Sequence, residues 1–436
     1  MKILFLKPAM YPSEKTNSLQ PLAFAVLNAL TPKEIERVFY DESIESIPLD
    51  ETADLVAMSV ETFTAKRAYQ IASIYKERNI PVIMGGFHPS IEPAEALEHA
   101  TSVAIGDAEG FWGQVISDLK EGRLKSIYRN NTESEYIQTS FDRSIFRNKK
   151  YLPFNMVQWN RGCKFQCDFC AIKSFYPKTL VSRPIDEVIQ EIKELDNKPL
   201  FIVDDNIYQN KTELKEFLEK ITLLKKRWGC QISLDVTRDD ELMNLLGRSG
   251  CILVLVGIES LNDDNLKQMN KRSNLSISDY KSAINKFRKH GIMIYGTYIF
   301  GYEHDTNEQF EKAVEFSKTM KFALANFNPL YPMPGTELYN RLKKEKKLLF
   351  EKWWLDYDFY YGKAMLKPIK LSCKELEDGC FQAKRSFNSI RSILFRALDL
   401  NCNSKNLSNF LLYMIINLSN RKQIYRKQGK RLVVVE

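Results

Sequence analysis

Residues 155–170 read NMVQWNRGCKFQCDFC, an apolar run that is followed by three of the eight cysteines in this 436-residue chain. The run has the length and the apolar content of a short buried strand. The thiols after it follow a C-x3-C-x2-C spacing at Cys163, Cys167 and Cys170. The order strand, cysteine loop, helix is therefore the starting point for predicting the fold.

Strand and helix patterns continue to alternate from this stretch to about residue 330. The predicted strands occupy residues 155–160, 200–206, 230–236, 252–260, 292–301 and 322–330, with helical patterns at 185–195, 212–228, 240–249, 278–290 and 307–320. Six such units predict a partial (β/α)6 TIM-like barrel, two units short of a complete one. The loops after barrel strands form the active-site face, so we expect the three cysteines at the barrel mouth.

The first 130 residues show a second alternating series, which predicts an α/β, Rossmann-like, doubly wound parallel sheet. Its apolar runs are ILFLKP, RVFYDE, LVAMSV, PVIMGG and VAIGD. Ligands bind at the carboxyl ends of such strands. The candidate ligand contacts at these strand ends are Ser59, Glu61, Gly85, Gly86, His88, Gly106 and Glu109. Glycines would let a flat ligand approach the backbone, although tight turns explain them as well, and a single His on a loop is often a packing residue.

The chain is divided on these patterns into four parts: residues 1–130, a polar linker at 131–152, the barrel at 153–345 and a mostly helical, basic domain at 346–436. Aromatic residues crowd the start of the last part, at Trp353, Trp354, Tyr357, Phe359, Tyr360 and Tyr361. We expect most of them to pack this domain against the barrel, and contact with a substrate is the alternative.

Composition indicates a folded protein, with 44% hydrophobic and 27% charged residues. No apolar run approaches the roughly 20 residues of a membrane span, and Met1 opens directly into a predicted strand, so we expect a cytoplasmic protein. From residue 341 onward the chain has 21 Lys and Arg against 9 Asp and Glu. The apolar run Phe410–Ile416 beside these cations suits peripheral docking on an anionic membrane, and a buried helix with a solvated basic end is the alternative.

Three thiolates can bind zinc or an iron-sulfur cluster. A structural zinc site uses a fourth protein ligand, and the other five cysteines are scattered singly, at Cys230, Cys251, Cys373, Cys380 and Cys402. A 4Fe-4S cube on three cysteines leaves one iron open for a small molecule. Three unrelated buried thiols are the remaining alternative.

The spacing, with Phe169 before the last cysteine and a six-unit barrel around it, resembles the radical S-adenosylmethionine superfamily. The resemblance implies a 4Fe-4S cluster on Cys163, Cys167 and Cys170 and a 5′-deoxyadenosyl radical formed from S-adenosylmethionine. It also implies contacts to that cofactor from Phe169, Asp204, Asp205, Glu259, Ser260 and Pro332. The last is part of PLYPMPGTELY, which resembles a superfamily segment near the adenine. Helix caps and turns are the structural alternatives for these positions.

Residues 55–112 closely resemble the cobalamin-binding domain of the subgroup described as B12-dependent. The strand-end residues of the first domain, from Ser59 to Glu109, are then implied cobalamin contacts, although a D-x-H-x-x-G motif is absent. Methylation of an unactivated carbon is implied, as in hopanoid methylases, with a small-molecule or lipid-like substrate, a reductant such as flavodoxin or ferredoxin, and no nucleic acid. Cyclase chemistry and a non-catalytic cobalamin or cluster sensor are the alternatives. Related methylthiotransferases carry further cysteines before the barrel, whereas residues 1–162 contain none.

Overall fold

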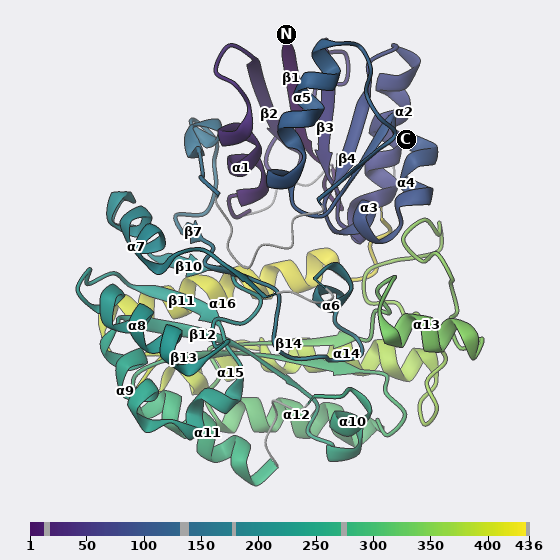
Figure 1. The fold of residues 1–436 in the computed structure, drawn as a ribbon. Helices are drawn as coiled ribbons and strands as arrows, with labels where there is room; N and C mark the ends of the chain where they lie inside the picture. The colour runs from purple at the N-terminus through teal and green to yellow at the C-terminus, as the bar shows by residue number, and fades with distance from the viewer. Residues whose placement is uncertain (13–17, 131–138, 177–179, 272–276, 433–436) are drawn as a thin grey trace.

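The computed structural model describes residues 1–12, 18–130, 139–176, 180–271 and 277–432, and it stacks one parallel sheet above another (Figure 1). The upper sheet has the order β2-β1-β3-β4-β5-β6, and all neighbouring strands are parallel. Its strands are β1 (Lys2–Lys7), β2 (Glu36–Asp41), β3 (Leu55–Ser59), β4 (Val82–Gly85), β5 (Ser102–Ile105) and β6 (Ile127–Arg129). The predicted doubly wound sheet is confirmed.

Helices cover both faces of this sheet, as the alternation predicts. They are α1 (Leu22–Leu30), α2 (Ala65–Glu77), α3 (Phe87–Ile91), α4 (Pro93–His99) and α5 (Trp112–Lys120). One buried cluster joins α1 and α5 to the sheet through Phe5, Phe24 and Trp112, and a second joins α2 through Ala68 and Ile71. Strand β6 lies in a mostly polar stretch, where Ile127 and Tyr128 are not part of a longer apolar run. It is an edge strand that pairs only with β5.

The lower sheet forms the partial barrel, with the order β14-β13-β12-β11-β10-β7 and parallel pairing throughout. Its strands are β7 (Asn155–Val157), β10 (Leu200–Ile202), β11 (Trp228–Gln231), β12 (Cys251–Glu259), β13 (Met293–Phe300) and β14 (Leu324–Pro329). The six predicted units are therefore confirmed. The third strand begins earlier than predicted, and a 3-10 helix at Leu234–Arg238 takes the second half of the predicted segment.

Seven helices of the described chain surround or follow these strands: α7 (Ile185–Glu194), α8 (Lys211–Thr222), α9 (Asp240–Arg248), α10 (Asp263–Gln268), α11 (Ile277–Lys289), α12 (Asn307–Thr319) and α13 (Glu337–Lys344). A short helix, α6 (Ala171–Phe175), follows the cysteines, and an antiparallel pair, β8 (Asn160–Arg161) and β9 (Val181–Ser182), encloses it. The predicted linker lies partly outside the described residues, at 131–138.

The carboxyl-terminal part is mostly helical, as predicted, with α14 (Cys373–Phe387), α15 (Ile390–Ala397) and α16 (Leu407–Lys427). Helix α14 packs on β14 and α12, and α15 and α16 cover the base of the barrel beside the starts of β13 and β14. Trp353, Trp354 and Phe359 join the core of the upper domain as well, which the sequence did not indicate. No described helix combines the length and the apolar composition needed to cross a bilayer.

Candidate active site

The cysteine loop is held in place at its start by the segment that follows β10. Gly162 adopts φ +91, a conformation that favours glycine, and its N–H donates to Asp205 Oδ2 at 3.0 Å. Gln209 Nε2 donates to the Gly162 carbonyl at 3.1 Å, and Gln209 Oε1 accepts from the Lys164 N–H at 3.1 Å. The backbone on both sides of Cys163 is therefore fixed by the segment after β10.

The second half of the loop is held by Asp168, which lies between Cys167 and Cys170 and is 4% exposed. Its carboxylate accepts from Tyr302 Oη at 2.7 Å and pairs with Arg341 Nη2 at 2.7 Å. Its backbone N–H donates to the Met269 carbonyl at 3.1 Å. Asp168 thus connects the loop to the end of α10, to the segment after β13 and to α13, a role that no spacing in the sequence indicates.

The three thiols fit a shared iron-sulfur cluster in number and position. All are free and half-buried on one short loop after the first barrel strand. Burial raises the pKa of Cys163 and Cys167, and it raises the pKa of Cys170 to about 12, while the charge of Lys271 acts to lower all three. Within the described chain no three His, Cys, Asp or Glu side chains converge around one point, and in a cube each thiolate binds its own iron.

Glu259 and Lys271 form a largely buried ion pair beside the cysteines, with Oε1 and Nζ 3.2 Å apart. Burial lowers the pKa of Lys271, but Glu259 and the nearby thiols outweigh that effect, and the net shift is upward. Glu259 ends β12 with φ +63, a strained conformation for a non-glycine residue that is typical of functional sites. The pair offers a carboxylate and an ammonium next to the cysteine loop.

The other polar residues expected near S-adenosylmethionine differ in how many of their side-chain oxygens already accept hydrogen bonds from the protein. Asp204 is fully engaged by the protein, because one oxygen accepts from the Trp159 N–H at 2.8 Å and the other from Asn160 Nδ2 at 2.9 Å. Asp205 accepts a hydrogen bond from the Gly162 N–H with Oδ2, and its Oδ1 has no hydrogen bond to another described residue. Ser260 is 3% exposed, and its Oγ accepts from the Asn262 N–H at 3.1 Å.

Two more of these expected contacts lie in apolar surroundings. Phe169 is half-buried and packs against the barrel core. Pro332 is buried, and its carbonyl accepts from Trp353 Nε1 at 2.9 Å. Among the residues expected to contact S-adenosylmethionine, Asp205 and Glu259 therefore have carboxylate oxygens near the cysteine loop. Asp204 and Ser260 instead form hydrogen bonds within the protein.

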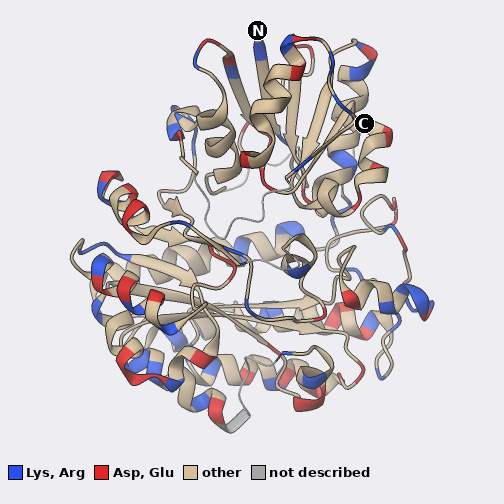
Figure 2. Ribbon diagram, viewed as in Figure 1, with Lys and Arg blue, Asp and Glu red and all other residues tan. Residues whose placement is uncertain are grey.

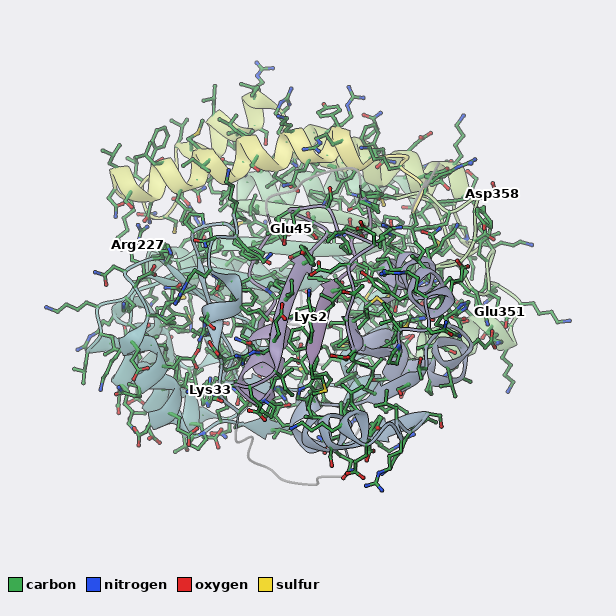
Figure 3. The ribbon with its side chains drawn as sticks, turned by 90° about the horizontal axis from the view of Figure 1, so that it is seen from above. Lys2, Lys33, Glu45, Arg227, Glu351 and Asp358 are labelled. Carbon is green, nitrogen blue, oxygen red and sulfur yellow. The ribbon has the colours of Figure 1, made fainter. Side chains whose placement is uncertain are left out.

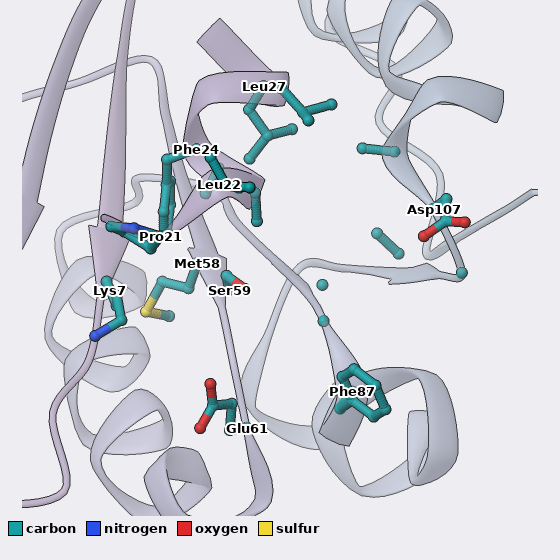
Figure 4. A pocket seen from close by; sticks show the side chains of 18 of the residues that line it. Lys7, Pro21, Leu22, Phe24, Leu27, Met58, Ser59, Glu61, Phe87 and Asp107 are labelled. Atoms are coloured by element: carbon teal, nitrogen blue, oxygen red, sulfur yellow. The ribbon is translucent and has the colours of Figure 1, made fainter. Parts of the chain in front are cut away.

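A cavity of about 520 Å³ lies at the carboxyl ends of β1, β3, β4 and β5 (Figure 4). Six of the seven expected cobalamin contacts line it: Ser59, Glu61, Gly85, Gly86, Gly106 and Glu109. Met58, Phe24 and Phe87 give it an apolar wall. The position after neighbouring parallel strands is the one where open α/β sheets bind their ligands. The partly apolar lining fits the face of a large planar cofactor.

The remaining expected contact, His88, is not brought to the cavity. It lies in helix α3 and not on a loop, and it is fully buried. Its Nε2 lies 3.0 Å from Tyr69 Oη and 3.1 Å from Glu95 Oε1, and its ring packs edge-on against Trp354. The physical reason is the helical turn after Gly86, which directs Phe87 to the cavity and His88 to the interior.

Two of the cavity glycines are required by the backbone itself. Gly86 has φ +103, and a Cβ there would lie 2.9 Å from the backbone N and O of Val60. Gly106 has φ +84, and a Cβ would lie 3.3 Å from that of Asn130. Turn geometry thus explains both residues without a ligand, which is the alternative that the sequence left open.

Arg161 joins the cavity to the cysteine loop. The Nη1 atom of Arg161 lies 3.1 Å from Asp107 Oδ2, and its Nη2 lies 2.8 Å from Glu109 Oε1. Burial lowers the pKa of Arg161, but the two carboxylates outweigh it and the net shift is upward. Arg161, Phe175 and Tyr176 from the barrel line the same cavity as the sheet of the upper domain. The cavity therefore lies between the two domains, and only Gly162 separates Arg161 from Cys163.

Part of the barrel interior is polar, and the sequence alone did not identify these positions. On β13 and β14 alternate residues are half-exposed, namely Tyr295, Thr297, Ile299, Leu324, Asn326 and Asn328, while the intervening ones are buried under the helices. Asn326 donates to Tyr295 Oη. Asn328 Oδ1 is buried without a hydrogen-bond partner among the described residues. The alternation of residues along these strands predicted two faces, but only the fold showed which face points into the barrel.

Comparisons with known proteins agree with this geometry. Residues 157–317 match the model of the Radical SAM superfamily. The chain is 32% identical to the bacteriochlorophyllide d C-12(1)-methyltransferase of Chlorobaculum tepidum, over 90% of this chain and 88% of that protein. It is 24% identical to the hopanoid C-2 methylase of Rhodopseudomonas palustris, over 76% of this chain and 66% of that protein.

A solved structure shares the arrangement of the domains. The radical S-adenosylmethionine methyltransferase TsrM from Kitasatospora setae, with cobalamin and a 4Fe-4S cluster bound, superposes with a TM-score of 0.64 at 16% identity, over 88% of this chain and 81% of that one. The family uses a 4Fe-4S cluster and S-adenosylmethionine, and the three half-buried thiols at the barrel mouth are the residues that fit the cluster. The chain therefore belongs to the radical S-adenosylmethionine superfamily of enzymes.

Proposed function

We propose that this enzyme is a cobalamin-dependent methylase of an unactivated carbon in a large, mostly apolar substrate. The observation that carries the proposal is the Arg161 junction, which holds the edge of the interdomain cavity against the cysteine loop through Asp107 and Glu109. A cofactor in the cavity would face the barrel mouth, and a substrate in the barrel would lie between that cofactor and the cluster.

Separate residues would hold the cluster and S-adenosylmethionine. Cys163, Cys167 and Cys170 would hold the cluster, and Asp205 and Glu259 would accept hydrogen bonds from the ammonium group of S-adenosylmethionine. When bound, the cluster with S-adenosylmethionine supplies the radical that removes a hydrogen atom, and cobalamin supplies the methyl group. The apolar cavity wall and the closed Arg161 junction would exclude water from the space between them.

The substrate class follows from the relatives and from the barrel interior. The two reported relatives act on a bacteriochlorophyllide and on a hopanoid. Both are extended and mostly apolar molecules, so we propose a tetrapyrrole-like or lipid-like substrate here. Tyr295, Asn326 and Asn328 offer the few polar contacts that orient such a molecule in an otherwise apolar barrel. The proposal also includes a small reductant protein such as flavodoxin or ferredoxin, and peripheral membrane contact for a lipid-like substrate.

Product analysis tests the reaction class. Anaerobically reconstituted enzyme, given reductant, S-adenosylmethionine and a bacteriochlorophyllide or hopanoid, should form 5′-deoxyadenosine together with S-adenosylhomocysteine and a methylated product. 5′-Deoxyadenosine with a ring-closed product and no S-adenosylhomocysteine would instead indicate a cyclase. Neither product, from protein with full iron content, would favour a sensor.

A matched pair of cysteine variants controls this experiment. Cys163→Ala should abolish formation of 5′-deoxyadenosine because it removes a cluster ligand. Cys373→Ala should retain it, because Cys373 is a half-buried thiol whose Sγ contacts the Leu366 carbonyl in the carboxyl-terminal domain. Equal activity of the two variants would contradict the assignment of the cluster to this loop.

A further inference from the structure

Helices α15 and α16 expose an unusual amount of apolar surface. Of the seventeen large hydrophobic side chains that are exposed in the described chain, eleven lie between Ile390 and Tyr425. They are Ile390, Leu394, Phe395, Leu398, Leu400, Leu407, Phe410, Leu411, Ile415, Leu418 and Tyr425. We call this surface the α15–α16 face. Contiguous exposed apolar surface of this kind marks an interaction site in a folded protein.

The face follows from the way in which α16 is attached. Its inward stripe is partly polar: Tyr413 Oη donates to the Ile393 carbonyl at 2.8 Å, and Asn417 Nδ2 donates to the Ala323 carbonyl at 3.0 Å. Its outward stripe repeats at helical spacing through Leu407, Leu411 and Ile415, which are 73%, 50% and 65% exposed. Hydrogen bonds therefore hold the helix to the barrel base, and the leucines are turned away from the core, the reverse of an ordinary surface helix.

The two helices lie together at the edge of the molecule. Figure 3 shows α16 along the outer side, with its side chains projecting outward, and Arg227 near its first turn. Arg227 Nη2 donates to Asn409 Oδ1 at 2.8 Å, which holds that end of the helix to the barrel. Helix α15 packs beside α16 through Ile393, Ala397 and Tyr413. The apolar side chains thus project from a two-helix platform that is packed on the base of the barrel.

The charge on this platform has one sign. Residues 388–431 contain nine Lys and Arg and a single acidic residue, Asp399. Asp399 is 3% exposed and is paired with Arg288, with Oδ1 and Nη2 3.1 Å apart, so it contributes little negative charge to the surface. Figure 2 shows cations and no acidic residue along α16. Arg391, Lys405 and Lys422 are exposed among the apolar side chains.

We propose that the α15–α16 face docks the enzyme on an anionic lipid bilayer. Apolar side chains that project from helices, with Lys and Arg among them, match the acyl boundary and the anionic headgroups together. A second copy of the chain fits less well, because a two-fold interface would place this cationic face against itself. The docking specifies the peripheral membrane contact that is part of the proposed function. It does not depend on the proposed reaction, since it uses neither the cysteine loop nor the interdomain cavity.

Flotation on sucrose gradients tests the docking with the reconstituted full-length enzyme. Wild type should float at low salt with vesicles of phosphatidylcholine and phosphatidylserine, and it should float much less with phosphatidylcholine alone or at high salt. Replacing Arg391, Lys405 and Lys422 together by Gln should weaken binding on the order of 100-fold, because each cation near an anionic surface contributes about fivefold. Leu411→Gln with Ile415→Gln should weaken it by about tenfold or more.

Leu223→Gln is the matched control, because Leu223 is 79% exposed on the barrel and lies outside the face. It should float as wild type does. Absence of flotation with anionic vesicles at low salt would overturn the proposal. A dimer in solution that Leu411→Gln with Ile415→Gln dissociates, without vesicle binding, would assign the face to a second copy. Binding to immobilised polyglutamate without flotation would assign it to an acidic protein. Because flotation needs no substrate, its failure leaves the product analysis unaffected.

Discussion

Replacing Asp168 by Ala should loosen the cysteine loop without removing a thiol. The carboxylate is 4% exposed and takes two charge-assisted hydrogen bonds, from Tyr302 Oη and Arg341 Nη2, each 2.7 Å long. A hydrogen bond to a charged group contributes about 1.5–3 kcal/mol, so the loss amounts to roughly 3–5 kcal/mol of loop closure. At about 1.4 kcal/mol per tenfold change, the open loop should become on the order of 100- to 4,000-fold more populated.

The assay is the rate at which an iron chelator removes iron from the reconstituted enzyme under anaerobic conditions. Iron loss through an opened loop follows the population of the open form, so Asp168→Ala should lose iron on the order of 100-fold faster than wild type. Tyr302→Phe removes one of the two bonds and leaves the Arg341 pair, so its rate should lie between those of the two proteins, about tenfold above wild type.

Asp186→Ala is the control for this prediction. Asp186 is 84% exposed and pairs with Lys220 on the surface of the barrel, where an ion pair contributes about 0–1 kcal/mol. Its iron should leave at the wild-type rate. If Asp168→Ala also kept the wild-type rate, the carboxylate would not hold the loop, and the reasoning from its two contacts would be wrong.

Two further predictions concern the cavity and the barrel. Ser59→Phe should reduce corrin absorbance after reconstitution by about tenfold or more at unchanged iron content, because a phenyl ring in the cavity costs about 1–3 kcal/mol of steric overlap with the cofactor. Ser73→Phe, on the exposed side of α2, is the control and should bind cobalamin as wild type does. Burial raises the pKa of Asp305 to about 6, so the folded protein holds its proton more tightly than the unfolded chain, and stability falls as the pH rises from about 4 to 6. Urea unfolding at a series of pH values should show Asp305→Asn gaining up to about 3 kcal/mol on wild type across that range, and a constant difference would contradict the burial argument.

Much of the fold was predictable because period-2 and helical patterns are local. The six barrel strands and five of the six upper strands correspond to apolar runs, and Cys163, Cys167 and Cys170 were predicted to share one loop. Strand β6 was missed, because an edge strand needs no apolar run of its own. The aromatic stretch near Trp353 was predicted to pack the carboxyl-terminal domain against the barrel. Its contacts also reach Glu95 of the upper domain, 259 positions away in the chain.

The candidate site divides along the same line. Position after a strand was enough to predict that Ser59, Gly85 and Glu109 border a cavity, since parallel strands end at one edge of a sheet. It was not enough to place His88, because one step along a helix turns a side chain by about 100° from the cavity to the core. Asp168 was not identified at all, because both of its partners are more than a hundred residues away.

The sequence by itself determined the two parallel sheets, the three cysteines of one loop that we propose as cluster ligands, and the basic, apolar composition of the last helices. Each of these depends on periodicity, spacing or composition within a short segment. Only the tertiary structure decided which residues hold the cysteine loop, how Arg161 joins the interdomain cavity to it, and that the leucines of α16 face outward. Those features depend on which distant segments meet. Contact between distant segments is set by packing of the whole chain, and no local pattern encodes it.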